Sequence, residues 1–537
     1  MTTRALPLRA RVAPAPDGRA ASLWDPLTDD VVRGGPLARE RFATRWADTD
    51  ALRRLADAKR APLDAALAAA MAEQHRRLGA PPASLAALER LARGEAVAVV
   101  AGQQPAPLGG PLYAFHKIAS AVGLAAEAAA RAGLEVVPLF WVHGEDSDFA
   151  EVRHAMLADA ALQVADLALP EDAHTEGGLV GNVPLAPLAA LEAQALARWD
   201  GLPGAPAAGA ALAAARAAAR DLGEAYAALA LALFGAHGLV VVDPRVAAFR
   251  AAARPIVERY LAAADALHEA ARRAGARLEA LGARRALDDR ALESFVFAIE
   301  DGSRHKIPAA GARARAALSP SVALRPAVQD GVFPTIGMAC GPGELAYLAQ
   351  LREVFEGVGV RPACAVPRFG ATWLPAQAIA LLEASGADPW ELVTGADAVL
   401  RRHAEAAVPE AARAALAAAH AAALDGLARV AEAARAVDPS LPQMVDSARA
   451  KVDFQYQRLH EGLVGKVRHQ LERRHPEWAR LRYYLLPGDR LQERRLCGLE
   501  PIVRRGPGAA EDMVELAAQH ARGLAAGEHT HALVDLA

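Results

Sequence analysis

The 537-residue chain is poor in cysteine, lysine and aromatic residues, and neither sign of charge is in large excess. Its three cysteines, Cys340, Cys364 and Cys497, form no C-x-x-C pair, which excludes a disulfide framework and a cysteine-rich zinc site. This usage predicts a cytoplasmic protein. The formal charge of −3 argues against a nucleic-acid partner, because a phosphate-backbone binder normally has a basic excess.

Long hydrophobic runs are also missing. The amino terminus lacks the apolar core of a signal peptide, and the best candidate for a membrane span, residues 225–242, is broken by Gly235, His237 and Gly238. We therefore expect no membrane partner. The composition, 53% hydrophobic and 23% charged, is that of a chain that can bury a large core.

Short apolar runs separated by helical stretches predict the architecture of that core. Residues 96–101 and 136–142 are uncharged runs of strand-forming residues, and a glycine-rich loop and a helical stretch over about 112–131 join them. Similar runs return at 239–243 and 361–366. Continuous rather than alternating hydrophobicity is typical of strands that are covered on both faces. The sequence thus predicts an α/β fold with a doubly wound parallel sheet.

Composition shifts along the chain predict four parts. Apolar residues at helical spacing beyond residue 409, on both sides of a proline-rich turn at 438–442, indicate an antiparallel helical arm for packing or dimerisation. The four parts are a helical segment packed on the core (1–90), the core with irregular insertions at about 150–235 and 250–330 (91–375), the arm (376–475) and a segment that returns to the core (476–537).

The first candidate binding segment follows the first predicted strand. Its glycines would let backbone N–H groups approach a ligand closely, and the start of the next helix favours an anion. Lys117 shares a helix face with Tyr113, because the two are four residues apart. A plain strand-to-helix turn is the alternative interpretation. The candidate binding residues here are Gly102, Gln103, Gln104, Gly109, Gly110, Pro111 and Tyr113.

The second segment begins at Trp141 and places several carboxylates at a strand end. Glu145, Asp146 and Asp148 lie within four residues, and Glu151 follows. Repelling carboxylates in a small space raise at least one pKa unless a cation is held there. The cluster is suited to a substrate ammonium, to Mg²⁺ or to general-base catalysis. The alternative is an acidic loop in solvent.

The third segment comprises residues 318–330 and continues to Tyr347. Its residues 341–346 fit the dinucleotide pattern G-x-G-x-x-A through Gly341 and Gly343. The acidic residue that would bind a ribose about 20 residues later is absent. Glu344 would also repel a pyrophosphate at the start of the helix. We therefore expect Glu344 and Tyr347 to orient an amine.

Two arginines are candidate clamps for a carboxylate or phosphate. Arg325 lies in the first part of the third segment, and Arg368 follows the next predicted strand. A guanidinium offers a planar pair of donors that matches such anions. Surface ion pairs are the alternative role for both.

Taken together, these segments resemble the cysteine ligase family of bacillithiol biosynthesis. The match is collinear over about residues 95–500. Ser147 stands where the family motif usually has histidine, and His143 precedes it. The matching stretches are 101–113 with Lys117, 140–148 with Glu151 and His154, 318–330, 341–351, 367–372 and 487–494.

The resemblance implies a Rossmann-like core similar to class I aminoacyl-tRNA synthetases, together with a helical coiled-coil domain that forms a homodimer. It implies amide formation between cysteine and glucosaminyl malate as the last step to bacillithiol, and it adds Gln329 and Asp330 as binding residues. We expect ATP with Mg²⁺, because a free carboxylate does not acylate an amine in water. The alternatives are a nucleotidyltransferase or synthetase-like enzyme on this fold and a non-catalytic binding scaffold. The expected catalytic residues are Lys117, Glu145, Asp146, Asp148 and Glu344.

Overall fold

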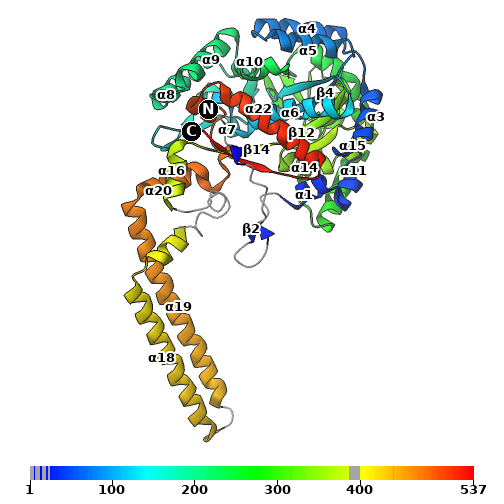
Figure 1. The fold of residues 1–537 in the computed structure, drawn as a ribbon. Coiled ribbons are helices and arrows are strands. Elements are labelled where there is room, and N and C mark those ends of the chain that lie inside the picture. The colour runs from blue at the N-terminus through cyan, green and yellow to red at the C-terminus, as the bar shows by residue number, and fades with distance from the viewer. Residues whose placement is uncertain are drawn as a thin grey trace. The chain divides into compact units, whose positions relative to one another are not determined.

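The computed structural model describes residues 25–315, 317–385, 400–438 and 441–536, and three short strands before them (Figure 1). The chain divides into two compact units. The first unit comprises Met1–Ala376 and Asp489–Ala537, and the second comprises Gln377–Gly488. The three short strands are β1 (Ala5–Leu6), β2 (Ala13–Pro14) and β3 (Ala20–Ala21).

A five-stranded sheet forms the centre of the first unit, and all its neighbouring strands are parallel, as the sequence predicts. The strand order is β13-β12-β4-β5-β8. Strand β12 was not among the predicted strands, because Gly337 interrupts a run of only six residues. The strands are β4 (Val97–Gln103), β5 (Val136–Val142), β8 (Val240–Val242), β12 (Thr335–Cys340) and β13 (Cys364–Pro367).

Alternate residues of each strand face two separate hydrophobic cores, so both faces of the sheet are buried. In β4, Val97 and Val99 belong to one core and Ala98 and Val100 to the other. This arrangement explains the continuous hydrophobicity of the strand sequences. The helices that cover the first face include α6 (Tyr113–Ala132) and α10 (Leu222–Phe234), and those that cover the second include α5 (Pro82–Ala92) and α11 (Ala247–Ala280).

The chain reverses its direction of travel through the sheet between β4 and β12. It runs outward from β4 through β5 to β8, and then returns to β12 on the other side of β4. Connections that leave two neighbouring strands in opposite directions open a crevice at their carboxyl ends, where ligands bind in such sheets. This point lies next to Gln103 and Cys340, the last residues of β4 and β12.

The stretches that the sequence marks as irregular insertions are largely helical. Alanine, which dominates them, is the best helix former, and α11 spans 34 residues that include Pro255 and a kink at Ala263. The first stretch holds α7 (Phe149–Val152), β6 (His154–Ala158), β7 (Val164–Ala168), α8 (Leu185–Arg198), α9 (Ala205–Ala218) and α10. The second holds most of α11, then β9 (Val296–Glu300), β10 (Ser303–Lys306), α12 (Ala309–Ala312), β11 (Leu318–Pro320) and the start of α13 (Arg325–Val332).

The segment after residue 488 packs on the first face of the sheet. Its helix α22 (Gly508–Ala525), red in Figure 1, lies along α6. Gly123 permits this contact, because a Cβ there would lie 2.6 Å from the backbone of Ala517. The remaining elements of the first unit are α1 (Pro26–Arg33), α2 (Pro36–Arg41), α3 (Thr49–Lys59), α4 (Ala65–Arg77), α14 (Pro342–Ala349), α15 (Arg352–Gly357), β14 (Gly370–Leu374), α21 (Glu500–Arg505) and β15 (His531–Asp535).

The second unit contains two long antiparallel helices. His420 of the first accepts or donates a hydrogen bond with Asp453 of the second at 2.7 Å, and its ring stacks on Tyr456. The predicted proline-rich turn falls partly on residues 439–440, outside the described part of the chain. The helices are α16 (Ala376–Ser385), α18 (Glu410–Arg435), α19 (Leu441–Arg474) and α20 (Pro476–Leu485).

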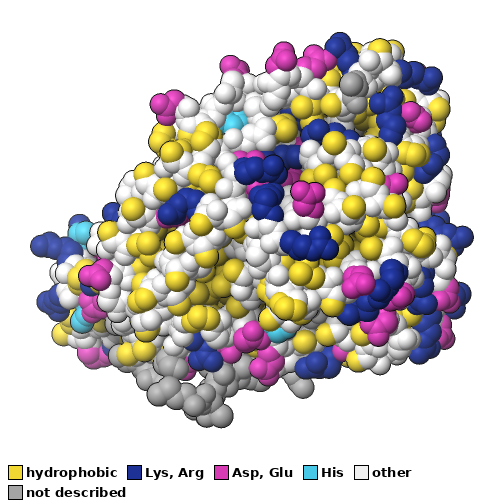
Figure 2. Space-filling model, turned by 90° about the horizontal axis from the view of Figure 1, so that it is seen from above, with side chains coloured by type: hydrophobic (Ala, Val, Ile, Leu, Met, Phe, Trp, Pro, Cys, Tyr) yellow, Lys and Arg dark blue, Asp and Glu magenta, His cyan; other side chains and the backbone are white. Residues whose placement is uncertain are grey.

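Two surface features bear on the expected partners. By length and composition alone, α18 is the one helix of the described residues that could cross a membrane, and alanine supplies most of its apolar character. On the face shown in Figure 2, basic and acidic side chains are interleaved among hydrophobic ones. That face therefore presents no broad field of a single sign.

Candidate functional site

A cleft of about 450 Å³ lies beyond the carboxyl ends of β4, β5 and β12, at the reversal point of the sheet. The three candidate segments meet there, although they lie far apart in the sequence. The predicted residues that line the cleft are Gln103, Gln104, Tyr113, Lys117, Asp146, Arg325, Gly341, Gly343, Glu344, Tyr347 and Arg368.

Lys117 connects the ends of β4 and β12 across the floor of the cleft. Its Nζ lies 2.8 Å from Glu344 Oε2 and donates hydrogen bonds to the Gly102 carbonyl at 2.9 Å and to Gln103 Oε1 at 3.1 Å. The same Glu344 oxygen accepts the Gly341 N–H at 2.8 Å and thereby caps α14. An ammonium has three donors, so these contacts use them all.

Arg368 points into the cleft, but another residue of the chain occupies its two terminal nitrogens. They lie 3.0 and 2.5 Å from the carboxylate oxygens of Glu493, and Nη1 also donates to the Phe369 carbonyl. Although burial opposes it, Arg368 lowers the pKa of Glu493 well below its usual value. The planar pair of donors that the sequence assigns to a ligand is thus held by an internal carboxylate.

A buried histidine extends this network. His116 Nδ1 lies 2.8 Å from Glu493, and Trp373 Nε1 lies 3.1 Å from His116 Nε2. Burial lowers the pKa of His116, so the ring is neutral. Since the indole N–H is only a donor, Nε2 accepts from Trp373 and Nδ1–H donates to Glu493. The imidazole therefore fixes the carboxylate that fixes Arg368.

Arg325 is held differently and keeps donors for a ligand. Its Nη1 lies 2.6 Å from His143 Nδ1. Burial, and then the positive charges of Arg325 and Lys117, lower the pKa of His143 well below its usual value. A neutral imidazole accepts at Nδ1 from Arg325 and leaves the rest of the guanidinium available at the border of the cleft.

Two carboxylates of the cleft lining share the amide of Gln104. Gln104 Nε2 donates to Asp146 Oδ2 at 3.3 Å and to Glu151 Oε2 at 2.8 Å. The backbone N–H of Ser147 donates to Asp146 Oδ1 at 2.8 Å. Burial, and then the nearby Asp146 charge, raise the pKa of Glu151 against the effect of Gln104. Asp146 is thus fixed in place, and Glu151 is suited to accept a proton.

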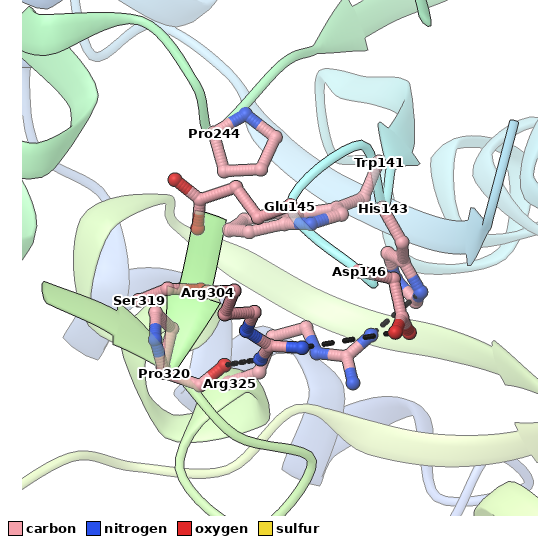
Figure 3. A pocket seen from close by; sticks show the side chains of 9 residues that line it. All are labelled: Trp141, His143, Glu145, Asp146, Pro244, Arg304, Ser319, Pro320 and Arg325. Atoms are coloured by element: carbon pink, nitrogen blue, oxygen red, sulfur yellow. Dashed lines mark hydrogen bonds and ion pairs between the residues drawn. The ribbon is translucent and has the colours of Figure 1, made fainter. Parts of the chain in front are cut away.

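A small side chamber, of about 20 Å³, adjoins the cleft and shares His143, Asp146 and Arg325 with it (Figure 3). Glu145 lies in this chamber, with its carboxylate pointing away from that of Asp146. Its Oε1 accepts from Arg250 at 2.9 Å, and burial raises its pKa despite that partner.

Several predicted binding residues do not line the cleft. The backbone of the glycine-rich loop packs on the C-terminal segment, where Gly498 N–H donates to the Gly110 carbonyl at 2.7 Å. Leu112 N–H donates to the Leu496 carbonyl at 2.7 Å, so a protein carbonyl occupies the amino end of α6. Gly109 and Pro111 lie in this packed loop.

Asp148 and the pair Gln329 and Asp330 have contacts that hold the fold. Asp148 lies outside the cleft lining and caps α7 by accepting the Glu151 N–H at 3.1 Å. Asp330 accepts from Thr335 Oγ1 and from Ala363 N–H, each at 2.6 Å. Thr335 starts β12, which places Asp330 and Gln329 at the end of the sheet opposite to the cleft.

Trp141 fills the core next to the side chamber. Its ring packs edge-on against Phe249 at 5.0 Å. Sequence reasoning missed Arg304, which lines the chamber from β10. The signal available was a basic run, residues 304–306, one residue after the Asp301-Gly302 turn of a β-hairpin.

Comparisons with known proteins agree with this geometry. Residues 19–315 and 309–369 match the family described as Bacillithiol biosynthesis BshC, N-terminal Rossmann-like domain, which is more than half of the chain. The chain belongs to the BshC family. The matched residues include the whole five-stranded sheet and end just after Arg368, so Glu493, which holds that arginine, lies beyond them.

Curated BshC relatives cover most of this chain. One from Geobacillus kaustophilus is 31% identical over 500 residues, 87% of this chain and 91% of its own length. One from Thermus thermophilus is 33% identical over 451 residues, which are 79% of this chain and 87% of its own length. One from Koribacter versatilis is 31% identical over 417 residues, which are 73% of this chain and 76% of its own length. Each relative is named "Putative cysteine ligase BshC".

Proposed function

We propose that this BshC protein is a cysteine ligase that joins L-cysteine to glucosaminyl malate through an amide bond, the last step of bacillithiol biosynthesis. The names of its relatives support a ligase acting on cysteine. The observation that carries the proposal is that one cleft, at the reversal point of the sheet, is lined both by the Arg325 cation and by the Asp146 and Glu151 carboxylates. Such a mixed site suits an amine, which prefers the carboxylates, and an acid, which prefers the arginine.

The acidic wall of the cleft supports proton removal from the amine. In amide formation, the amine nitrogen bonds to the carboxyl carbon, an activated oxygen leaves, and the nitrogen loses a proton. The ammonium form of the amine cannot attack, so a base must take one proton from it first, and a second proton leaves the nitrogen as the amide forms. Glu151 is the candidate base, because its pKa is raised, and Asp146 is fixed beside it to hold the ammonium form.

We also propose that ATP with Mg²⁺ provides the activation. Mg²⁺ is held in such sites by one or two carboxylates together with substrate phosphates. Asp146 and Glu151, bridged by Gln104, would hold the ion while the carboxyl group is activated, before the amine takes its place beside them, and Arg325 and Arg494 are cations on the lining that phosphates would need. The described residues contain no cluster of three or more His, Cys, Asp or Glu side chains that could hold a metal ion, so the ion would enter with the nucleotide. When bound, the nucleotide would supply an activated form of the carboxyl group.

We propose further that the protein is a cytoplasmic homodimer that associates through a coiled coil of α18 and α19. Apolar side chains on α19 support this, since Phe454 and Leu459 are 55% and 57% exposed. Sedimentation equilibrium of the wild-type chain and of a Phe454→Glu, Leu459→Glu variant would test it. A monomeric wild-type protein at micromolar concentration would contradict the proposal.

The ligase proposal is tested by incubating the purified protein with cysteine, glucosaminyl malate and ATP-Mg²⁺ and detecting bacillithiol by mass. We expect product with the wild type and at least a 100-fold loss, about 2.7 kcal/mol, with Asp146→Asn. Asp172→Asn is the matched control, because Asp172 is exposed and lies outside the cleft. Absence of product with every nucleotide tried would contradict the ligase function.

A further inference from the structure

The side chamber contains a buried arginine with an unused donor. The Arg304 side chain is only 8% exposed, and its guanidinium lies 3.8 Å from the centre of the Phe297 ring. Nη2 donates to the Pro320 carbonyl at 3.0 Å. Its Nε–H is buried and has no hydrogen-bond partner among the described residues. A buried donor of this kind costs free energy unless a ligand or a water accepts from it.

The chamber also has a surplus of positive charge. Asp146 is the nearest carboxylate to Arg304, but Oδ1 lies 3.7 Å from Nη1, beyond hydrogen-bond distance. The other acid, Glu145, is paired with Arg250. Arg304 and Arg325 therefore have one carboxylate between them in the chamber, that of Asp146, and its ion pair with Arg304 is a long one.

Two protonation effects agree with that surplus. Burial lowers the pKa of Arg304 to about 10, although the Asp146 charge opposes this. The pKa of His143 is lowered by burial and by Arg325, Lys117 and Arg304. An incoming anion would relieve both effects, since it supplies the negative charge that the chamber lacks.

We propose that the border between the chamber and the cleft is a carboxylate subsite, in which Arg304 Nε–H and the free donors of Arg325 bind one carboxylate of a dicarboxylic substrate. The chamber, at about 20 Å³, has room for one small group, whereas the cleft, at about 450 Å³, accommodates the rest of a sugar-sized molecule. The shared lining of His143, Asp146 and Arg325 joins the two spaces. Figure 3 shows both guanidinium groups side by side at that border.

This inference rests on the proposed function only for the identity of the substrate, a glycoside of malate. Arg304 and Arg325 come from separate elements, β10 and α13, and Arg368 is excluded from the same role because Glu493 occupies it. The subsite therefore assigns acid recognition to the segment between β8 and β12.

Calorimetric titration of the full chain with L-malate and with its dimethyl ester tests the subsite. We expect malate to bind the wild type, and the ester to bind at least 10-fold more weakly, because it has no charge to offer. Arg304→Gln should weaken malate binding about 10- to 100-fold, the range for a lost hydrogen bond to a charged group. Arg304→Lys keeps the charge but loses Nε–H, so its affinity for malate should lie between those of the wild type and Arg304→Gln.

The matched control is Arg315→Gln. Arg315 lies near the same hairpin and pairs with Glu300, but its side chain is 47% exposed and it lines neither space. It should bind malate as the wild type does. Thermal unfolding shows whether each variant is folded. If Arg304→Gln does not fold, the malate affinity of Arg304→Lys and the comparison of malate with its ester decide whether the subsite exists.

Equal binding of malate by the wild type and Arg304→Gln would overturn the proposal, because it would mean that a water, and not the ligand, accepts from Nε–H. No malate binding by the wild type, or equal binding of the ester, would overturn it as well. In the ligase assay, Arg304→Gln should raise KM for glucosaminyl malate and leave KM for cysteine unchanged. If the wild type makes no product, the proposed function fails, while the malate titration still decides the subsite.

Discussion

Two glycine-rich turns lead from strands into helices beside the cleft. The first packs against the C-terminal segment, and the second lines the cleft. The turn before α6 is closed by the C-terminal segment, whose Leu496 carbonyl accepts from Leu112 N–H. The turn before α14 lines the cleft, but Glu344 of the same helix occupies its Gly341 N–H. In neither turn is the helix end left as an open anion site. Negative groups of a ligand must therefore be met by side chains, above all by Arg325.

The largest effect is expected at Glu493, which lies in the same C-terminal segment that closes the first turn. Glu493→Gln leaves Arg368 buried without its counter-charge and places an amide N–H₂ against two donors, so we expect a loss of about 3–5 kcal/mol in the free energy of unfolding at neutral pH. Urea denaturation measures it. The exposed Glu515→Gln serves as the control and should change little.

The same variant has a defined pH dependence. The folded-state pKa of Glu493 is lowered, so its stabilising contribution is complete above the unfolded value of about 4.5 and disappears as the pH falls through the folded value. The difference between wild type and Glu493→Gln should therefore shrink in acid. A constant difference from pH 7 to pH 3 would show that Glu493 is not held as a carboxylate.

The next effect tests the contact that joins the two turns. Lys117→Gln removes the ammonium between Gly102 and Glu344, and we expect a loss of about 1.5–3 kcal/mol, since three hydrogen bonds from a charged donor are replaced by at most two neutral ones. Chemical denaturation measures the loss, with the exposed Lys451→Gln as control. Wild-type stability of Lys117→Gln would mean that the two turns are held independently.

Alanine at one glycine in each turn separates their roles. Gly109 has φ +82°, and a Cβ there would lie 2.5 Å from Phe115, so Gly109→Ala should cost about 1–2 kcal/mol or more. If folded, it should bind malate normally. A stable Gly109→Ala protein with impaired malate binding would show that the first turn contributes to the binding site.

The smallest change in stability is expected at the second turn. A Cβ at Gly343 would have no atom within 4 Å, so Gly343→Ala should change the free energy of unfolding by less than about 0.5 kcal/mol. Its methyl group would project into the cleft lining and should raise KM in the ligase assay. Unchanged kinetics would remove Gly343 from the binding surface.

The sequence predicts what depends on local patterns. Short apolar runs identify four of the five strands, and the carboxylates after β5 lie at the carboxyl edge as expected, because Asp146 follows the end of that strand by four residues. Asp330 precedes a strand instead, which places it at the opposite edge. That strand, β12, is the one that the sequence did not predict, because Gly337 interrupts its apolar run.

Partners far away in the chain could not be predicted. Arg368 has a suitable neighbour only because Glu493, 125 residues later, folds back onto it. A hairpin places Arg304 at the side chamber, and the alanine-rich composition of the surrounding sequence hides that hairpin. Each of these side chains has the expected chemistry, but the fold, and not the spacing, decides whether it contacts a ligand or another residue.

The return of residues 493–498 to α6 has a consequence for synthesis on the ribosome. A nascent chain that ends before residue 490 already contains every strand of the parallel sheet, yet it has an unmatched guanidinium in its interior and an uncovered amino end of α6. Contacts between such distant segments form late, because closing a long loop is entropically costly. Prematurely terminated products should therefore be inactive and short-lived, and the enzyme becomes competent only when its last helices have emerged.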